Sequence, residues 1–213
     1  MKLPELKHDS AFSVEKAISQ RRSVRSYADN TLSLEEVSQL LWAAQGMTGA
    51  SGERSAPSAG ATYPLRAYVA AGNVPGLPAG IYKYDCQAHE LTLLFNGDER
   101  GKLADATRGQ SWVSEAPASL IICSSAGSTM QRYPEMGERY VYMEAGHAAQ
   151  NVYLQATALG LGTVAVGAFD APAIKRLLWL LPHEQPLYIM PVGQPAQGDK
   201  IDRIKTANHP RST

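Results

Sequence analysis

The chain has 213 residues, of which 44% are hydrophobic and 19% are charged, a composition typical of a globular protein with one buried core. Its 20 basic and 20 acidic residues give a formal net charge of zero, which argues against a nucleic-acid-binding surface. The amino terminus lacks the apolar stretch of a signal peptide, and no apolar run has the length of a membrane helix. We therefore expect a soluble, cytoplasmic protein that binds neither nucleic acid nor membrane.

The amino-terminal part of the chain predicts two helices. Residues 12–20 predict a short helix with Ser13 as its N-cap, and residues 21–25, Arg-Arg-Ser-Val-Arg, follow it directly. Ser33 and Glu36 have the spacing of a capping box and begin a second helix that ends near Gly46.

A long irregular segment separates these helices from a group of predicted strands. Residues 47–64 are rich in Gly, Ser and Ala and show almost no periodicity, and such segments inside compact domains are usually functional or disordered. A helix is predicted over residues 98–107, and another begins at Asp170, the expected N-cap, with Pro172 in its first turn. Apolar runs predict strands at residues 66–71, 80–85, 90–95, 118–123, 163–166 and 186–193.

The longest predicted helix begins at Tyr140 and ends at Gly160. It is rich in small residues such as Gly146, and Glu144 is its only carboxylate. A helix of this kind is usually buried, either in the centre of a domain or between subunits. The element order predicts a single α+β domain over residues 1–213: a mixed central sheet flanked by helices, with a polar arm at residues 1–12 and a polar tail at residues 195–213.

Several common site motifs are absent from the sequence. Cys86 and Cys123 lie far apart without paired spacing, so we expect two reduced thiols in the core. The five histidines show no metal-ligand spacing, and we expect no metal site. The sequence also lacks a phosphate-binding P-loop and a Gly-x-Ser-x-Gly nucleophile elbow.

Two segments have both a functional and a structural interpretation. The three arginines and the serine of residues 21–25 could bind a phosphate or another anion, or could form a solvated basic turn. Residues 56–64 could be a flexible loop, or their small side chains could allow the backbone to approach a flat ligand.

Four motifs, taken together and in order, resemble the flavin-dependent nitroreductase family. They are Arg-Arg-Ser-Val-Arg at residues 21–25, Pro-Ser-Ala-Gly-Ala-Thr-Tyr-Pro at 57–64, Glu-Ala-Gly-His-Ala-Ala-Gln-Asn at 144–151, and Gly-Leu-Gly-Thr-Val at 160–164 followed by Val-Gly-Ala-Phe at 166–169. The second and third motifs resemble the branch related to SagB-type dehydrogenases. The resemblance spans residue 13 to about residue 193.

This resemblance implies a fold, a cofactor and a set of binding residues. It implies an intertwined α+β homodimer with two FMN molecules at the subunit interface, and a long helix that forms much of the dimer core. The flavin phosphate, ribityl chain and pyrimidine edge would be held by Arg21, Arg22, Ser23 and Arg25. The loop that the other subunit lays against the flavin would contain Pro57, Ser58, Ala59 and Gly60, and the segment along the isoalloxazine would contain Val166, Gly167 and Ala168. Arg203, with Lys205 as second choice, would complete the phosphate site.

The implied activity comes from the cofactor. FMN would take a hydride at N5 from NADH or NADPH and reduce nitroaromatics, quinones or another small-molecule acceptor, while the protein binds and orients both substrates. We therefore assign no catalytic side chain. Two alternatives stay open: a SagB-like dehydrogenase that oxidises a modified peptide or small metabolite, and a non-catalytic flavin-binding protein.

One residue disfavours the oxidation of peptide azolines. SagB-type azoline oxidases are thought to use a Lys-Tyr pair shortly before the long helix, and the counterpart here is Arg132-Tyr133. An arginine is a poor proton acceptor at neutral pH.

Overall fold

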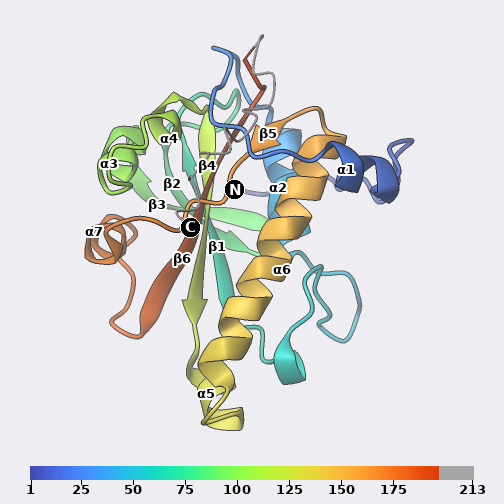
Figure 1. Ribbon diagram of the computed structural model, residues 1–213, viewed down its shortest axis with the longest axis vertical. Helices are drawn as coiled ribbons and strands as arrows, with labels where there is room; N and C mark the ends of the chain where they lie inside the picture. The colour runs from blue at the N-terminus through green and yellow to red at the C-terminus, as the bar shows by residue number, and fades with distance from the viewer. Residues whose placement is uncertain (197–213) are drawn as a thin grey trace, which may run out of the picture.

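A six-stranded sheet forms the centre of the computed structural model, which describes residues 1–196 (Figure 1). The strand order is β3-β2-β1-β4-β6-β5, and all five pairings between neighbouring strands are antiparallel. The sheet is therefore antiparallel and not mixed as predicted, and the one parallel contact among the described residues is an isolated bridge between Ser23 and Thr163. The strands are β1 (Leu65–Ala71), β2 (Gly80–Asp85), β3 (Glu90–Asn96), β4 (Ala118–Ser125), β5 (Gly162–Thr163) and β6 (Glu184–Gly193).

Three helices begin at the caps that the sequence predicts, whereas the long helix begins at Gly137, before the predicted Tyr140. Ser13 accepts a hydrogen bond from the N–H of Lys16, and Asp170 accepts one from the N–H of Ala173, so both are N-caps as predicted. The capping box of the second helix is also confirmed. Helices α4 and α5 were not predicted because segments this short show no periodicity. The helices are α1 (Val14–Gln20), α2 (Leu34–Gln45), the 3₁₀ turn η1 (Ala59–Ala61), α3 (Arg100–Asp105), α4 (Trp112–Glu115), α5 (Gly127–Arg132), α6 (Gly137–Ala158) and α7 (Ala171–Leu177).

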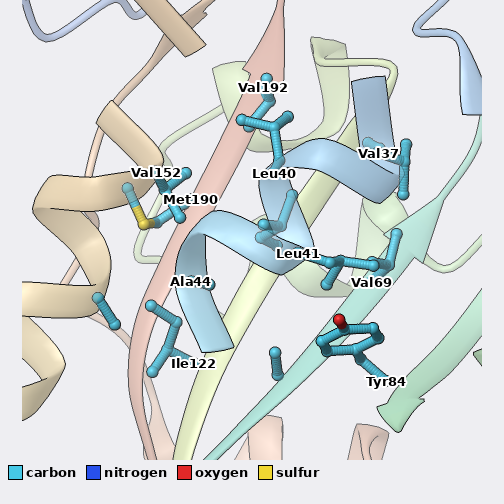
Figure 2. Close-up of a cluster of buried hydrophobic side chains, with 14 of the residues drawn as sticks. Val37, Leu40, Leu41, Ala44, Val69, Tyr84, Ile122, Val152, Met190 and Val192 are labelled. Atoms are coloured by element: carbon cyan, nitrogen blue, oxygen red, sulfur yellow. The ribbon is translucent and has the colours of Figure 1, made fainter. Parts of the chain in front are cut away.

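Helices cover both faces of the sheet (Figure 1). Side chains alternate between faces along a strand. Ile122 of β4 accordingly joins the apolar cluster formed with α2 and α6, while Ile121 joins the cluster formed with α3, α4 and α7. Figure 2 shows the first cluster, in which side chains of α2 meet side chains from α6 and from several strands.

The predicted strand at residues 163–166 is shorter than expected. The ladder of β5 ends at Thr163, and pairing with β6 resumes only as a single bridge between Val166 and Ile189. Between them Val164 lies opposite Pro191, which has no N–H to donate, so the ladder is interrupted there. The N–H of Ala165 points away from β6 and donates to the hydroxyl of Tyr153 on α6, over 2.8 Å.

The two cysteines are free thiols, as expected. Cys123 is fully buried in β4, and Cys86 is half-buried. Within residues 1–196, no helix is long and apolar enough to span a membrane, and no group of three or more His, Cys, Asp or Glu residues could hold a metal ion.

Truncating a core residue of α2 should cost more than truncating an exposed residue of the same type. Leu41 is fully buried and Leu181 is 55% exposed. We expect Leu41→Ala to lower the free energy of unfolding by about 2–5 kcal/mol, because it leaves a cavity, and Leu181→Ala to lower it by about 0.5 kcal/mol or less. Urea titration of both variants measures the difference. Equal losses would contradict the position of α2 in the core.

Candidate functional site

The segment of residues 21–25 lies beside the chain that follows the long helix. Ser23 bridges to Thr163, and the N–H of Val24 donates to the carbonyl of Thr163 over 3.0 Å. The hydroxyl of Tyr153 lies 3.1 Å from the Ser23 Oγ and accepts the Ala165 N–H. The tertiary structure thus brings the first motif and the last motif together, and Tyr153 joins them.

The arginines of this segment are available to an anion. Arg22 donates from Nη1 to the carbonyl oxygens of Ser19 and Arg21, over 3.0 and 2.7 Å. The guanidinium of Arg21 lies over the ring of Tyr153, 5.1 Å from its centre. Within the described part of the chain, Arg21, Arg22 and Arg25 form no ion pair with a carboxylate. Three positive charges without a partner at one turn favour binding of a phosphate or another oxyanion.

Residues 166–168 leave the sheet with free backbone donors. Val166 exchanges both backbone hydrogen bonds with Ile189, over 2.8 and 3.0 Å, and is buried. Gly167 and Ala168 are exposed, and within residues 1–196 their N–H groups have no hydrogen-bond partner. A Cβ added at Gly167 would meet only Tyr188, at 3.9 Å, so this stretch of backbone is open to a ligand.

The loop of residues 57–60 lies at a different place along α6. It contacts α5, from which the Arg132 Nη1 donates to the Gly60 carbonyl over 3.2 Å. It also contacts the first half of α6. The 21–25 segment instead contacts the second half of α6, near Tyr153 (Figure 1). Within one chain, therefore, the structure does not bring the second motif together with the first and the last.

The backbone of this loop is held in an uncommon conformation. Gly60, Ala61 and Tyr63 have positive φ values of 60°, 54° and 45°. A Cβ at Gly60 would lie 2.7 Å from Arg132 Nε and from Tyr133 Oη, so both the positive φ and the space favour glycine there. The Ser58 Oγ accepts the Tyr63 N–H over 2.9 Å and closes the turn. Strained backbone that the surrounding structure holds in place is a feature of functional loops.

Glu144 is buried on α6 beneath this loop. Its side chain is 3% exposed, and within the described residues its Oε1 has no hydrogen-bond partner. Burial raises the pKa of the Glu144 carboxyl to about 6, and the Ser58 hydroxyl and the positive charge of Arg54 lower it in part. The sequence shows Glu144 as the single carboxylate of the helix predicted from Tyr140, but not its burial, and the observed helix also contains Glu138.

Sequence reasoning missed Tyr153. Its hydroxyl contacts both Ser23 and Ala165, but nothing in its local sequence identifies these distant partners. Arg203 and Lys205 lie outside the described residues, and their role in a phosphate site stays a prediction.

A cavity of about 380 Å³ lies nearby, between α1, α2 and α6. Ser13, Trp42 and Gln155 are among its lining residues, but none of the predicted flavin-binding residues lines it. This cavity therefore lies apart from the described residues of the predicted site.

The sequence profile of the Nitroreductase family matches residues 18–194. This chain belongs to the nitroreductase family. The predicted family and the α+β fold are thereby confirmed, and the protein is an oxidoreductase.

Relatives of this chain support the family assignment along nearly its whole length. A Methanocaldococcus jannaschii protein described as a nitroreductase is 43% identical over 194 residues, which are 91% of this chain and 96% of that one. The crystal structure of a Ralstonia eutropha JMP134 protein described as a nitroreductase superposes with a TM-score of 0.81. The two chains are 31% identical, and the match covers 92% of this chain and 89% of that one. The FMN reductase [NAD(P)H] of Bacillus subtilis is 24% identical over 93% of this chain and 69% of that protein.

Because Glu144 is buried, we expect that its replacement by an uncharged residue stabilises the protein in a pH-dependent way. Because its pKa is raised from 4.5 to about 6, the folded state favours the protonated carboxyl, so its contribution to stability is full below about pH 4.5 and is lost as the pH rises through about 6. Glu144→Gln should therefore raise the free energy of unfolding at pH 8 by about 1–2 kcal/mol, and by much less at pH 4.5. Urea titration at both pH values measures this.

The exposed Glu135 supplies the control for this measurement. Glu135→Gln should change stability by about 0.5 kcal/mol or less at either pH. A Glu144→Gln variant whose difference from wild type is the same at pH 4.5 and pH 8 would contradict the ionisation of a buried carboxyl.

Proposed function

We propose that this protein is a homodimeric, FMN-dependent oxidoreductase that uses NADH or NADPH to reduce nitroaromatics, quinones or another small acceptor. Bound FMN would supply the chemistry by accepting a hydride and passing electrons to the second substrate. The protein's own residues would bind and orient the cofactor, and none is required as an acid or base.

The observation that carries this proposal is the meeting of residues 21–25 with residues 163–168. One side of this junction offers arginines without carboxylate partners, which suit a phosphate, and the other offers the free N–H groups of Gly167 and Ala168. A flavin mononucleotide has a phosphate at one end and a flat ring that accepts hydrogen bonds at the other. The donor set on the chain therefore fits both ends of FMN. The name of the Bacillus subtilis relative, which includes FMN and NAD(P)H, supports the same cofactor and donor.

A second subunit would complete the site. Within one chain the 57–60 loop is separated from the 21–25 segment along α6, and one face of α6 is left open to solvent, with Tyr142 54% and Met143 47% exposed. Two copies of α6 that cross about a two-fold axis would place the loop of one subunit beside the arginines of the other. We therefore propose that Pro57, Ser58, Ala59 and Gly60 cover the flavin of the partner subunit.

The SagB-like alternative has less support from the structure. Arg132 donates to the carbonyl of Gly60, and its guanidinium lies 5.8 Å from the centre of the Tyr133 ring. These contacts give Arg132 a role in holding the 57–60 loop, which is consistent with a residue that stays protonated. Oxidation of a modified peptide or small metabolite would require a different proton acceptor.

Cofactor content and reduction test the proposed function. The purified protein should release FMN, about one per chain by the proposal, and NADH or NADPH should bleach the bound flavin under anaerobic conditions. A flavin that neither nucleotide reduces, together with no consumption of NAD(P)H with any acceptor, would favour the non-catalytic flavin-binding alternative. A protein that stays colourless after incubation with FMN would overturn the proposal.

Arg21 is the first residue to substitute. We expect Arg21→Ala to weaken FMN binding by about tenfold or more, since a charge-assisted hydrogen bond to phosphate is lost. Arg176, an exposed arginine of α7 on the other side of the sheet, supplies the matched control Arg176→Ala, which should bind FMN as wild type does. Flavin fluorescence titration measures both affinities, and equal affinities would contradict the phosphate position.

Gly146 tests the proposed interface. A Cβ at this position would meet no neighbouring atom within 4 Å outside its own turn of the helix, so we expect Gly146→Leu to leave the fold of the chain unchanged. If α6 packs closely against its partner, the variant should shift the protein from dimer to monomer in sedimentation experiments while circular dichroism stays unchanged. A stable dimer of the Gly146→Leu protein would show that this face of α6 lies outside the interface.

A further inference from the structure

The sheet opens at one end, between β1 and β2. Their ladder runs from Ala71 paired with Gly80 to Tyr68 paired with Lys83. Beyond it, β1 continues to Leu65 along β4, and β2 continues to Asp85 along β3. The two strands therefore diverge, and a cavity of about 340 Å³ lies where they separate. This volume is in the range of sites that bind small molecules.

The residues that line this opening give it a positive charge. Arg54, Arg66 and Lys83 all line it, and within residues 1–196 none of the three forms an ion pair with a carboxylate. Asp85 is the one carboxylate in the lining, and its Oδ1 accepts the N–H groups of Gln87 and Ala88 in the turn after β2. Among the described residues of the lining, three cations against one anion leave an excess of two positive charges, although Arg54 also interacts electrostatically with Glu144, which does not line the cavity.

Two of these cations are held in place. The Arg54 Nη1 donates to the Gln45 Oε1 over 2.9 Å, and its guanidinium lies 4.8 Å from the centre of the Tyr63 ring. The Arg54 Nε is buried and has no hydrogen-bond partner within the described residues. Arg66 donates from Nη1 to the carbonyl oxygens of Tyr63 and Leu65, over 3.0 and 2.9 Å. A fixed guanidinium with an unused buried donor is the arrangement that an oxyanion would complete.

We propose that this opening, the β1–β2 cavity, binds a small oxyanion, a metabolite that carries a carboxylate or a phosphate group. Arg54 and Arg66 provide fixed donors, and the exposed Lys83 adds a flexible cation at the mouth. None of the residues that we propose to bind the flavin lines the cavity, so the site is separate from the proposed cofactor site.

Cys86 provides a direct measurement of occupancy. It is half-buried and lines the cavity, whereas Cys123, the other cysteine of the sequence, is fully buried. The rate at which iodoacetamide alkylates the native protein therefore measures access to the cavity. Inorganic phosphate and succinate serve as the two probes, with sodium chloride of equal ionic strength as the reference. We expect at least one probe to slow alkylation in a saturable way.

Two substitutions test whether the cations of the cavity cause this protection. Lys83→Gln and Arg66→Gln should each raise the half-saturating concentration by about tenfold, because each removes a charge-assisted contact. Arg176→Gln removes one positive charge from α7, away from the cavity, and should leave protection unchanged. Lys83 is exposed and lacks a hydrogen bond within the described residues, so Lys83→Gln keeps the test valid if Arg66→Gln unfolds.

The outcomes separate the possible ligands from a failure of the proposal. Protection by phosphate alone identifies a phosphate-bearing ligand, and protection by succinate alone identifies a carboxylate. Protection by both supports a general oxyanion site. No protection by either probe, or equal protection in Lys83→Gln and Arg176→Gln, would overturn it. Flavin content plays no part in this readout, so the result is independent of the proposed function.

Discussion

The packing of α6 against the sheet is the contact on which the rest of the structure depends. The buried face of this helix is small, with alanines at 145, 148, 149 and 156, so the helix can lie close to α2 and to the strands. Close packing fixes both ends of a 22-residue helix relative to one sheet. Residues 21–25 and residues 57–60 contact the helix at different points along its length, so the same packing fixes their positions.

Two polar side chains of α6, Tyr153 and Glu144, each lie at one half of the candidate binding site. Tyr153, toward the carboxyl end, contacts Ser23 and the N–H of Ala165, so it ties the arginine segment to the chain after the helix. Glu144, about 14 Å nearer the amino end by helix geometry, lies under the strained 57–60 loop. One chain thus presents two separate halves at different points along α6, and we propose that a partner subunit brings them together.

Positive charge without a carboxylate partner marks both proposed binding regions. The zero net charge of the sequence does not show this, because net charge says nothing of where the charges lie in the fold. In the arginine segment the charges are exposed at a turn, whereas in the β1–β2 cavity two guanidinium groups are fixed by hydrogen bonds to Gln45 and to backbone carbonyls. The first arrangement suits a ligand that a second surface covers, and the second suits a small anion that enters a preformed opening.

The sequence by itself determined the local features. The caps at Ser13, Ser33 and Asp170 were predictable because each depends on a side chain and a backbone N–H only a few residues away. The order of four motifs was enough to predict the family and the α+β fold. The strand after α6 was predicted too long, since its ladder is interrupted where Val164 lies opposite Pro191, a pairing that periodicity cannot show.

Only the tertiary structure decided which distant groups meet. It placed Ser23 beside Thr163, separated the 57–60 loop from the arginines, and buried Glu144. It also opened the sheet between β1 and β2, where Arg54 and Arg66 come together with Lys83. Each of these depends on how helices and strands pack, and the packing follows from the burial of apolar faces by the whole chain, not from the residues of any one segment.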